Sequence, residues 1–148
     1  MEASSDTQQR NVEITRRGFE AYNSGDYEAV ISLLHPDVEL LADHELLNSG
    51  SFTGHEGFTQ WSAEWLEAWD EFRVDVNDLE TIGDHFVLVD AHQVATGAGS
   101  GIAVEMDIFW AFETEGGQLR RMHLYAKRER ALDAIERWRV EREGAADT

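Results

Sequence analysis

The fold is decided by residues 71–127, which read EFRVDVNDLETIGDHFVLVDAHQVATGAGSGIAVEMDIFWAFETEGGQLRRMHLYAK. Apolar and polar side chains nearly alternate in four runs, at about residues 71–83, 85–97, 101–114 and 118–127. Such alternation is typical of strands that bury one face. Because only short, mostly glycine-containing segments separate the runs, we expect consecutive strands to pair as an antiparallel meander.

Helices are predicted both before and after this meander in the sequence. The segment from about His55 to Asp70 repeats large side chains every three or four residues, so one face of the helix is almost entirely aromatic: Phe58, Trp61, Trp65, Leu66 and Trp69. A last helix is expected at about residues 128–142, with Ala131, Ile135 and Trp138 on one side.

Two helical patterns open the chain, at about residues 7–24 and 27–34; the second is short, and Asp26 stands where it needs an N-cap. A strand at Val38–Ala42 follows, and then a polar loop at Asp43–Gly54. Helices first and an antiparallel sheet after them predict an α+β fold in which the helices cover one sheet face.

The chain has 148 residues, of which 42% are hydrophobic, and we expect one domain, residues 1–148, with its core at about 8–136 and flexible ends. Its formal charge of −18 repels phosphate backbones and anionic lipids. It has no cysteine, which excludes disulfides and thiolate chemistry. Without a long apolar run or the apolar block of a signal peptide, it is predicted to be cytoplasmic, with neither nucleic acid nor membranes as partners.

Four motifs succeed one another: Asn23-Ser24-Gly25-Asp26, Leu34-His35-Pro36-Asp37-Val38-Glu39, Phe52-Thr53-Gly54-His55-Glu56-Gly57 and Trp69-Asp70-Glu71-Phe72-Arg73-Val74. Together they resemble the nuclear transport factor 2-like superfamily, most closely its SnoaL-like branch, over about residues 8–136. The resemblance implies a cone-shaped barrel, a curved antiparallel sheet wrapped around N-terminal helices with a C-terminal helix, enclosing a mostly apolar pocket. Ketosteroid isomerases, polyketide cyclases, epoxide hydrolases, dehydratases and binding proteins share this fold, so the fold alone assigns no activity.

The resemblance also indicates where isomerase chemistry would be sited. A tyrosine acid on the first helix, a general-base aspartate after the first strand and a second aspartate in the meander would fall near Gly18, near Ala42 and at Ile108. None of these three side chains titrates. The departure favours a binding protein without turnover.

The resemblance further implies which strand residues face the interior: Val87, Val89, Ala91, Gln93, Met106, Ile108, Trp110, Phe112, Leu119, Arg121, His123 and Tyr125. A small, largely apolar molecule is the predicted partner, and its binding residues are Phe19, Phe58, Trp61, Trp65, Gln93, Met106, Ile108, Trp110 and Arg121. For the tryptophans, plain core packing is the competing interpretation. Three large apolar residues, Phe86, Leu88 and Phe109, then face outward, which predicts a homodimer through the outer sheet face.

The candidate catalytic residues are His123, Asp43 and Tyr125. Imidazole titrates near neutral pH and a carboxylate holds its tautomer, so His123 and Asp43 form a candidate acid–base pair, with Tyr125 polarising a carbonyl. The competing interpretations are a hydrogen-bonded wall for His123 and Tyr125, a solvated loop for Asp43, and an ordinary ion pair for Arg121.

Three hypotheses follow: a ligand-binding protein, a cofactor-free isomerase, cyclase or dehydratase acting by proton transfer, and an interaction module that uses the outer sheet face. Neither a cofactor nor a metal is predicted. Asp90 and His92 share a strand face, but a metal site needs a third ligand. The glycines at 97–101 are followed by a strand pattern, so they indicate a hairpin rather than a phosphate loop.

Overall fold

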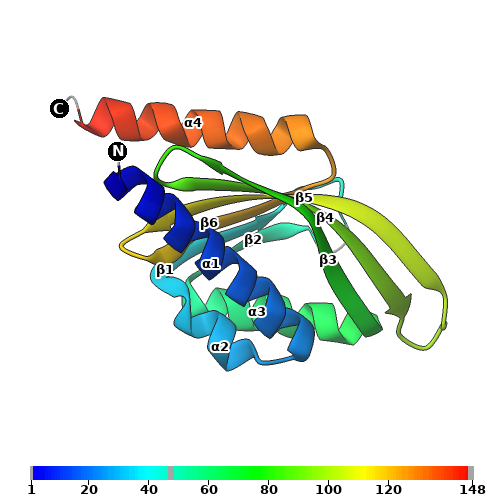
Figure 1. Ribbon diagram of the computed structural model, residues 1–148. Helices are drawn as coiled ribbons and strands as arrows, with labels where there is room; N and C mark the ends of the chain where they lie inside the picture. Colours follow the sequence, from blue (N-terminus) through cyan, green and yellow to red (C-terminus); the bar gives the residue numbers. More distant parts are fainter. Residues whose placement is uncertain (1, 47–48, 147–148) are drawn as a thin grey trace.

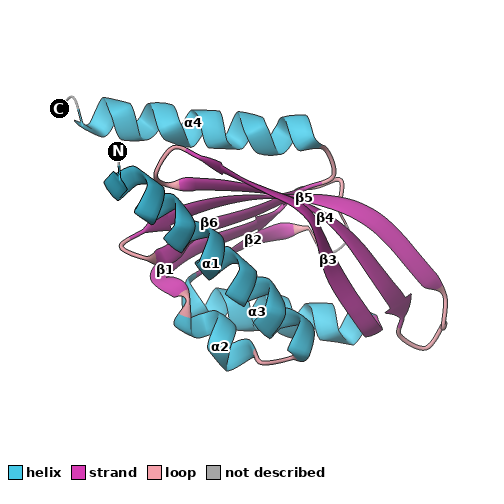
Figure 2. Ribbon diagram, in the orientation of Figure 1, coloured by secondary structure: helices cyan, strands magenta, loops and turns pink. Residues whose placement is uncertain are grey.

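The computed structural model describes residues 2–46 and 49–146, whose elements are α1 (Glu2–Ser24), α2 (Tyr27–Ser32), β1 (Leu34–Ala42), β2 (Gly50–Thr53), α3 (Gly54–Ala68), β3 (Trp69–Ile82), β4 (Phe86–Gly97), β5 (Ala103–Glu115), β6 (Gln118–Tyr125) and α4 (Arg128–Ala146). The six strands within these residues form one sheet in the order β2-β1-β6-β5-β4-β3. The meander β3–β6 is antiparallel as predicted, while β1 joins β6 in parallel. Figure 2 shows how strongly the long strands curve.

Helices lie on both faces of the sheet. The three N-terminal ones, α1, α2 and α3, fill the concave face, and α4 runs along the opposite face (Figure 1). The spacing of Phe58, Trp61 and Trp65 puts all three on the buried side of α3, as a helical repeat requires. The predicted α+β cone is confirmed, but the helices were expected on one sheet face, whereas α4 covers the other (Figure 1).

Local chemistry places the element boundaries. Asp26 caps α2 as predicted, accepting the Ala29 amide at 3.1 Å. That helix ends at Ser32, however, two residues before its predicted end, because the chain enters β1 at Leu34. The aromatic helix α3 stops at Ala68, so Trp69 begins strand β3. The predicted loop before α3 contains the short strand β2.

A β-bulge interrupts the pairing of β5 with β6. Thr114 opposes Leu119, but the adjacent Glu113 opposes Arg121, which leaves Arg120 as an extra residue. Side chains alternate between the two sheet faces, so one inserted residue exchanges the faces of everything that follows it.

Because of this bulge, the inner face of β6 differs from the predicted one. Met122 and Leu124 are buried in the cone, in the same cluster as the interior residues of β4 and β5. Arg121, His123 and Tyr125 instead lie on the outer face beneath α4. Their predicted position in the cone is wrong, because the alternation read from sequence assumed an uninterrupted strand.

Helix α4 covers the outer sheet face with a second apolar cluster. Phe86 and Leu88 are 2% and 3% exposed there, and Trp138 stacks on Phe86 with ring centroids 6.4 Å apart. Phe109 packs half-buried against the same cluster. The apolar side chains that suggested an interface between two copies are therefore covered within the chain itself.

Candidate functional site

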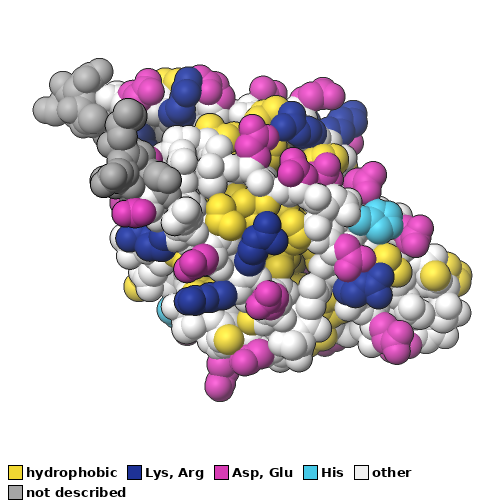
Figure 3. All heavy atoms as spheres, viewed as in Figure 1, with side chains coloured by type: hydrophobic (Ala, Val, Ile, Leu, Met, Phe, Trp, Pro, Cys, Tyr) yellow, Lys and Arg dark blue, Asp and Glu magenta, His cyan; other side chains and the backbone are white. Residues whose placement is uncertain are grey.

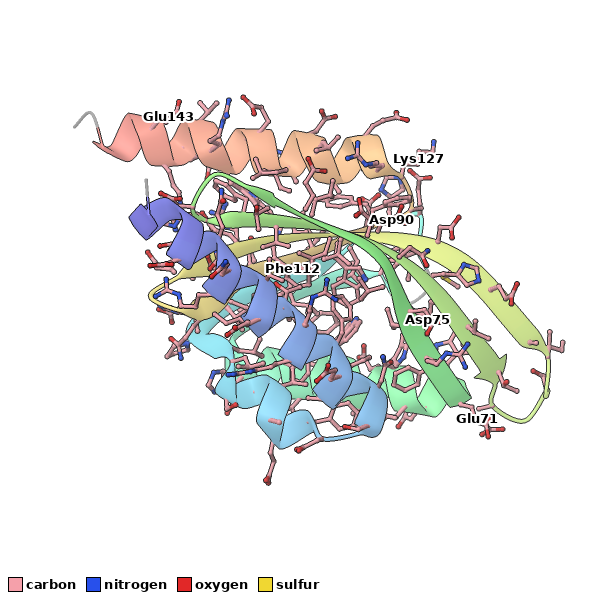
Figure 4. The ribbon with its side chains drawn as sticks, in the orientation of Figure 1. Glu71, Asp75, Asp90, Phe112, Lys127 and Glu143 are labelled. Carbon is pink, nitrogen blue, oxygen red and sulfur yellow. The ribbon has the colours of Figure 1, made fainter. Side chains whose placement is uncertain are left out.

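The interior of the cone is an aromatic cluster drawn from three elements. Tyr22 of α1 stacks on Trp61 of α3 at 6.0 Å, and Trp61 stacks on Trp65 at 5.8 Å with an interplanar angle of 18°. Trp110 of β5 stacks on Phe112 at 5.6 Å. Figure 4 shows Phe112 between helix α1 and the sheet. The aromatic faces on α1 and α3 thus meet the inward side of β5.

Two small cavities lie within this cluster. The larger, about 30 Å³, is lined by Thr15, Gly18, Phe19, Tyr22, Val30, Phe58, Trp61, Trp110, Phe112, Leu119 and Met122. The smaller, about 10 Å³, is lined by Tyr22, Ala42, Leu46, Trp61, Trp65, Val74, Gln93, Met106, Ile108, Trp110 and Leu124. Each has room for about one or two waters, far less than a typical ligand pocket of several hundred Å³. Side chains therefore fill almost all of the interior of the cone.

Eight of the nine residues predicted to bind a ligand line these cavities: Phe19, Phe58, Trp61, Trp65, Gln93, Met106, Ile108 and Trp110. Arg121 does not, because it lies on the outer face. The positions that the resemblance assigned to catalysis, Gly18, Ala42 and Ile108, also line the cavities. Among the described lining residues, the single titratable side chain is that of Tyr22.

Among the interior residues that the sequence analysis missed, Tyr22 is the one whose side chain titrates. It lines both cavities and also a surface groove of about 600 Å³ between the end of α1 and strands β3 and β4. Beside α1, Figure 3 shows hydrophobic side chains reaching the surface among charged ones. The signal was available in the sequence, since Tyr22 follows Phe19 by three residues and so shares its helix face.

Five side chains that line the smaller cavity hold a buried polar atom with no hydrogen-bond partner among the described residues. These atoms are Tyr22 Oη, Gln93 Nε2 and the indole Nε1 of Trp61, Trp65 and Trp110. Burial raises the pKa of Tyr22 well above its ordinary value, so its phenol stays protonated. All five groups are therefore able to donate a hydrogen bond.

His123 contacts residues on the outer side of the sheet. Its Nε2 lies 2.9 Å from Glu39 Oε2 and its Nδ1 lies 3.2 Å from the Tyr125 hydroxyl. The network assigns Nε2–H as donor to the carboxylate and Nδ1 as acceptor from the phenol. Its ring meets Trp138 edge-on at 4.7 Å. Burial lowers the pKa of His123, against the opposing effect of Glu39.

Ion pairs fasten α4 onto this face. Arg121 Nε lies 3.5 Å from both Glu39 Oε2 and Glu113 Oε1, and its Nη1 donates to Glu141 Oε2 at 3.2 Å. Arg142 of α4 donates to Glu113 Oε2 at 2.7 Å, and that carboxylate is buried. The guanidinium of Arg121 also sits over the Trp138 ring at 5.2 Å. For Arg121, the ion-pair interpretation therefore describes what the structure contains.

Asp43 is likewise engaged with α4. Arg130 Nη2 donates to Asp43 Oδ1 at 3.0 Å, and Arg130 Nε lies 2.9 Å from Oδ2 without the alignment of a hydrogen bond. His44 Nδ1 lies 3.2 Å from Asp43 Oδ1. Asp43 is 7% exposed, so it is not the solvated loop residue of the competing interpretation. Asp43 thus pairs with Arg130, whereas the hydrogen-bond partners of His123 are Glu39 and Tyr125.

No three His, Asp or Glu side chains within residues 2–46 and 49–146 are placed to hold a metal ion. His92 Nδ1 instead lies 3.0 Å from Asp107 Oδ1 on the neighbouring strand. Over the same ranges, no helix combines the length and apolarity needed to cross a bilayer.

A family model described as SnoaL-like domain matches residues 15–145. The search of curated proteins found no match. The matched range includes every residue that lines the two cavities.

Solved structures share the fold at low sequence identity. An NTF2-like protein of unknown function from Burkholderia pseudomallei matches with a TM-score of 0.73 and 16% identity, over 84% of this chain and 95% of that one. TerC, co-crystallized with polyporic acid, matches with a TM-score of 0.72 and 21% identity, over 86% of this chain and 98% of that one. A protein from Jannaschia sp. CCS1, described as a SnoaL-like polyketide cyclase, matches with a TM-score of 0.70 and 20% identity, over 80% of this chain and 85% of that one. Identities this low establish the fold alone.

Proposed function

The chain belongs to the SnoaL-like domain family, and we propose that it binds a small, planar, largely apolar molecule inside its cone. The observation that carries this proposal is the position of Tyr22, Trp61 and Trp110, which line both interior cavities. Aromatic walls with few polar atoms are typical of small-molecule sites. The co-crystallization of TerC with polyporic acid supports the proposal, because the two folds match over most of both chains.

Entry of such a molecule requires the ring of Tyr22 to move. Tyr22 separates the surface groove from the two cavities and is 7% exposed. Its hydroxyl has no partner among the described residues, so its rotation breaks no hydrogen bond there. Swinging this one ring outward joins the groove to both cavities and makes room for a ligand.

Proton-transfer chemistry receives less support. His123, Asp43 and Tyr125 pack under α4, outside the cone. Among the described lining residues, only Tyr22 titrates, and its raised pKa makes it a poor base. An isomerase, cyclase or dehydratase would need a base that these residues do not supply.

A homodimer remains a prediction, as does the cytoplasmic location. The basis of the homodimer prediction has changed, because α4 covers Phe86 and Leu88. Acidic side chains, among them Glu105 and Asp107, occupy strand β5 beyond the second apolar cluster, and the same charges on two copies repel. An interaction module acting through this face is correspondingly less favoured than ligand binding.

The test is binding of N-phenyl-1-naphthylamine, a neutral aromatic probe whose fluorescence rises in apolar surroundings. We expect saturable binding to the wild type at one site per chain. Tyr22→Ala should accelerate association at least tenfold, because it removes the ring between groove and cavities. Tyr27→Ala is the matched control, since Tyr27 lines the groove but neither cavity.

Saturable binding by Tyr22→Ala but not by the wild type would identify the ring as a permanent wall and refute the entry route. Absence of binding to the wild type, Tyr22→Phe and Tyr22→Ala, each with an unchanged circular dichroism spectrum, would refute the proposed function itself.

A further inference from the structure

Strand β3 lies at one end of the sheet order, so one of its edges has no neighbouring strand. Half of the backbone N–H and C=O groups of such a strand point away from the sheet and are able to pair with a further strand. The surface groove beside Tyr22 follows part of this edge, since residues 70–73 line it. The groove therefore gives access to backbone groups as well as to side chains.

One side chain already takes the place of a strand on this edge. Asn23, at the end of α1, donates from Nδ2 to the Val74 carbonyl at 2.8 Å, and the Val74 N–H donates to Asn23 Oδ1 at 2.9 Å. These are the two hydrogen bonds that a paired residue on a neighbouring strand would make. The N–H and C=O of Val74 consequently point away from β4.

The same edge is open two residues earlier. Residues 71–76 pair with residues 91–96 of β4 in unbroken register, so the backbone groups alternate between the two edges of β3. Phe72 therefore directs its N–H and C=O outward, as Val74 does, on the edge beside the groove. Within residues 2–46 and 49–146, neither group of Phe72 has a hydrogen-bond partner outside the sheet.

Aromatic rings lie next to this open position. The ring centroid of Phe72 is 5.2 Å from that of Tyr22, and Tyr22 meets Tyr27 at 5.6 Å. All three rings line the groove. On an added strand, the side chain opposite Phe72 would point to the same face of the sheet and pack on these rings, which favours an apolar side chain there.

Charge favours a basic residue beside that apolar one. Glu71 is exposed and points to the other face of the sheet, so the adjacent side chain of an added strand would lie opposite it. Figure 4 shows Glu71 near the start of β3. Asp70 adds a second exposed carboxylate to the groove. Arg73 is the cation among the described lining residues, and its Nε already donates to Asp75 Oδ1 at 2.9 Å.

We propose that the edge of β3 at Phe72 binds an extended, basic segment of a partner protein by strand addition. An apolar side chain of the segment packs on the rings of Tyr22 and Tyr27, and a lysine or arginine lies opposite Glu71. Backbone hydrogen bonds then hold the segment while its side chains select it. A second copy of this chain is a poorer occupant, because two chains with a formal charge of −18 repel each other.

The experiment uses three five-residue peptides: acetyl-Thr-Lys-Leu-Lys-Thr-amide, the same peptide with glutamate in place of both lysines, and the lysine peptide with an N-methyl group on its leucine. Lysine flanks the leucine on both sides, so either strand direction places one opposite Glu71. N-methylation removes one strand hydrogen bond and keeps every side chain. Affinities come from ¹H–¹⁵N NMR titrations of the full chain, and solvent exchange of the Phe72 amide is measured at saturating peptide.

We expect the lysine peptide to bind at least tenfold more tightly than the glutamate peptide and at least fivefold more tightly than the N-methylated one. It should slow exchange of the Phe72 amide at least fivefold, because that N–H then donates to the peptide. Glu71→Gln should weaken binding of the lysine peptide at least threefold. Glu64→Gln is the matched control, since it removes an exposed carboxylate of α3 outside the groove, and its effect should stay below twofold.

Absence of binding by the lysine peptide would overturn the inference. Equal affinity for the N-methylated peptide would overturn it too, because strand hydrogen bonds would then play no part, and equal affinity for the glutamate peptide would overturn the basic partner. Slowing of Phe72 exchange at high protein concentration without peptide would identify a second copy as the occupant instead. Phe72 and Glu71 line neither interior cavity, so this inference goes beyond the proposed function and fails separately from it.

Discussion

Replacing Gln93 by methionine should stabilise the ligand-free protein. The side chain is 2% exposed and its Nε2 has no partner among the described residues. Leaving a buried donor unpaired costs about 1–3 kcal/mol. Methionine has a similar length and adapts to irregular apolar space, so the substitution removes this cost without opening a cavity.

The expected gain is therefore about 1–3 kcal/mol in the free energy of unfolding, or roughly 2–12 °C in melting temperature for a domain of this size. Urea unfolding followed by circular dichroism measures it. Gln60→Met is the matched control, because Gln60 is exposed on α3 and its replacement should change stability by less than about 0.5 kcal/mol. If Gln93→Met instead loses 1 kcal/mol or more without ligand, the amide is hydrogen-bonded in the free protein and the reasoning from unpaired donors fails.

Trp138→Ala should cost about 3–5 kcal/mol, because a 4% exposed ring leaves a cavity between α4 and the sheet, whereas Val140→Ala on the exposed side of α4 should cost under about 0.5 kcal/mol; equal losses would contradict the packing of α4. Because burial lowers the pKa of His123, the unfolded chain binds a proton that the folded chain does not, so stability should fall as pH drops below about 6.5. In His123→Gln, the urea midpoint should change less with pH between about pH 5 and pH 8 than it does in the wild type. An unchanged pH dependence would show that other groups produce it. Asp26→Ala should cost about 1 kcal/mol of unfolding free energy through the lost N-cap of α2, and a loss below about 0.3 kcal/mol would show that the cap bond is not formed in solution.

Much of the cone was predictable, because the period of the hydrophobic pattern and the size of the side chains indicate which residues share a buried face. Helical spacing puts Trp61 and Trp65 on one face, and alternation does the same for Met106, Ile108 and Trp110. The family resemblance then indicated which strand face points inward, and all five residues line the cavities. These residues lie on uninterrupted elements, where counting from one residue fixes the face of the next.

The prediction failed after the bulge at Arg120, for which the sequence carries no strong signal. Nothing in Leu119–Arg120–Arg121 distinguishes a bulge from a regular strand, because bulges also form without glycine. The position of α4 was equally inaccessible: an amphipathic helix at the end of the chain can cover either sheet face. With both unknown, the polar residues of β6 were assigned to the wrong side.

The corrected assignment separates the polar groups by chemistry. Charged side chains, Arg121, Glu113 and Asp43 among them, pair with one another or with α4 on the outer face, where these ion pairs offset the cost of burying charge. The inner face keeps neutral donors such as Gln93 and the indoles, which are expensive to leave unpaired but need no countercharge. A base inside the cone would abstract a proton, whereas neutral donors orient an acceptor or stabilise charge on it but remove no proton. This separation is why the interior favours recognition over proton transfer, and why replacing Gln93 by an apolar side chain is expected to stabilise the ligand-free protein.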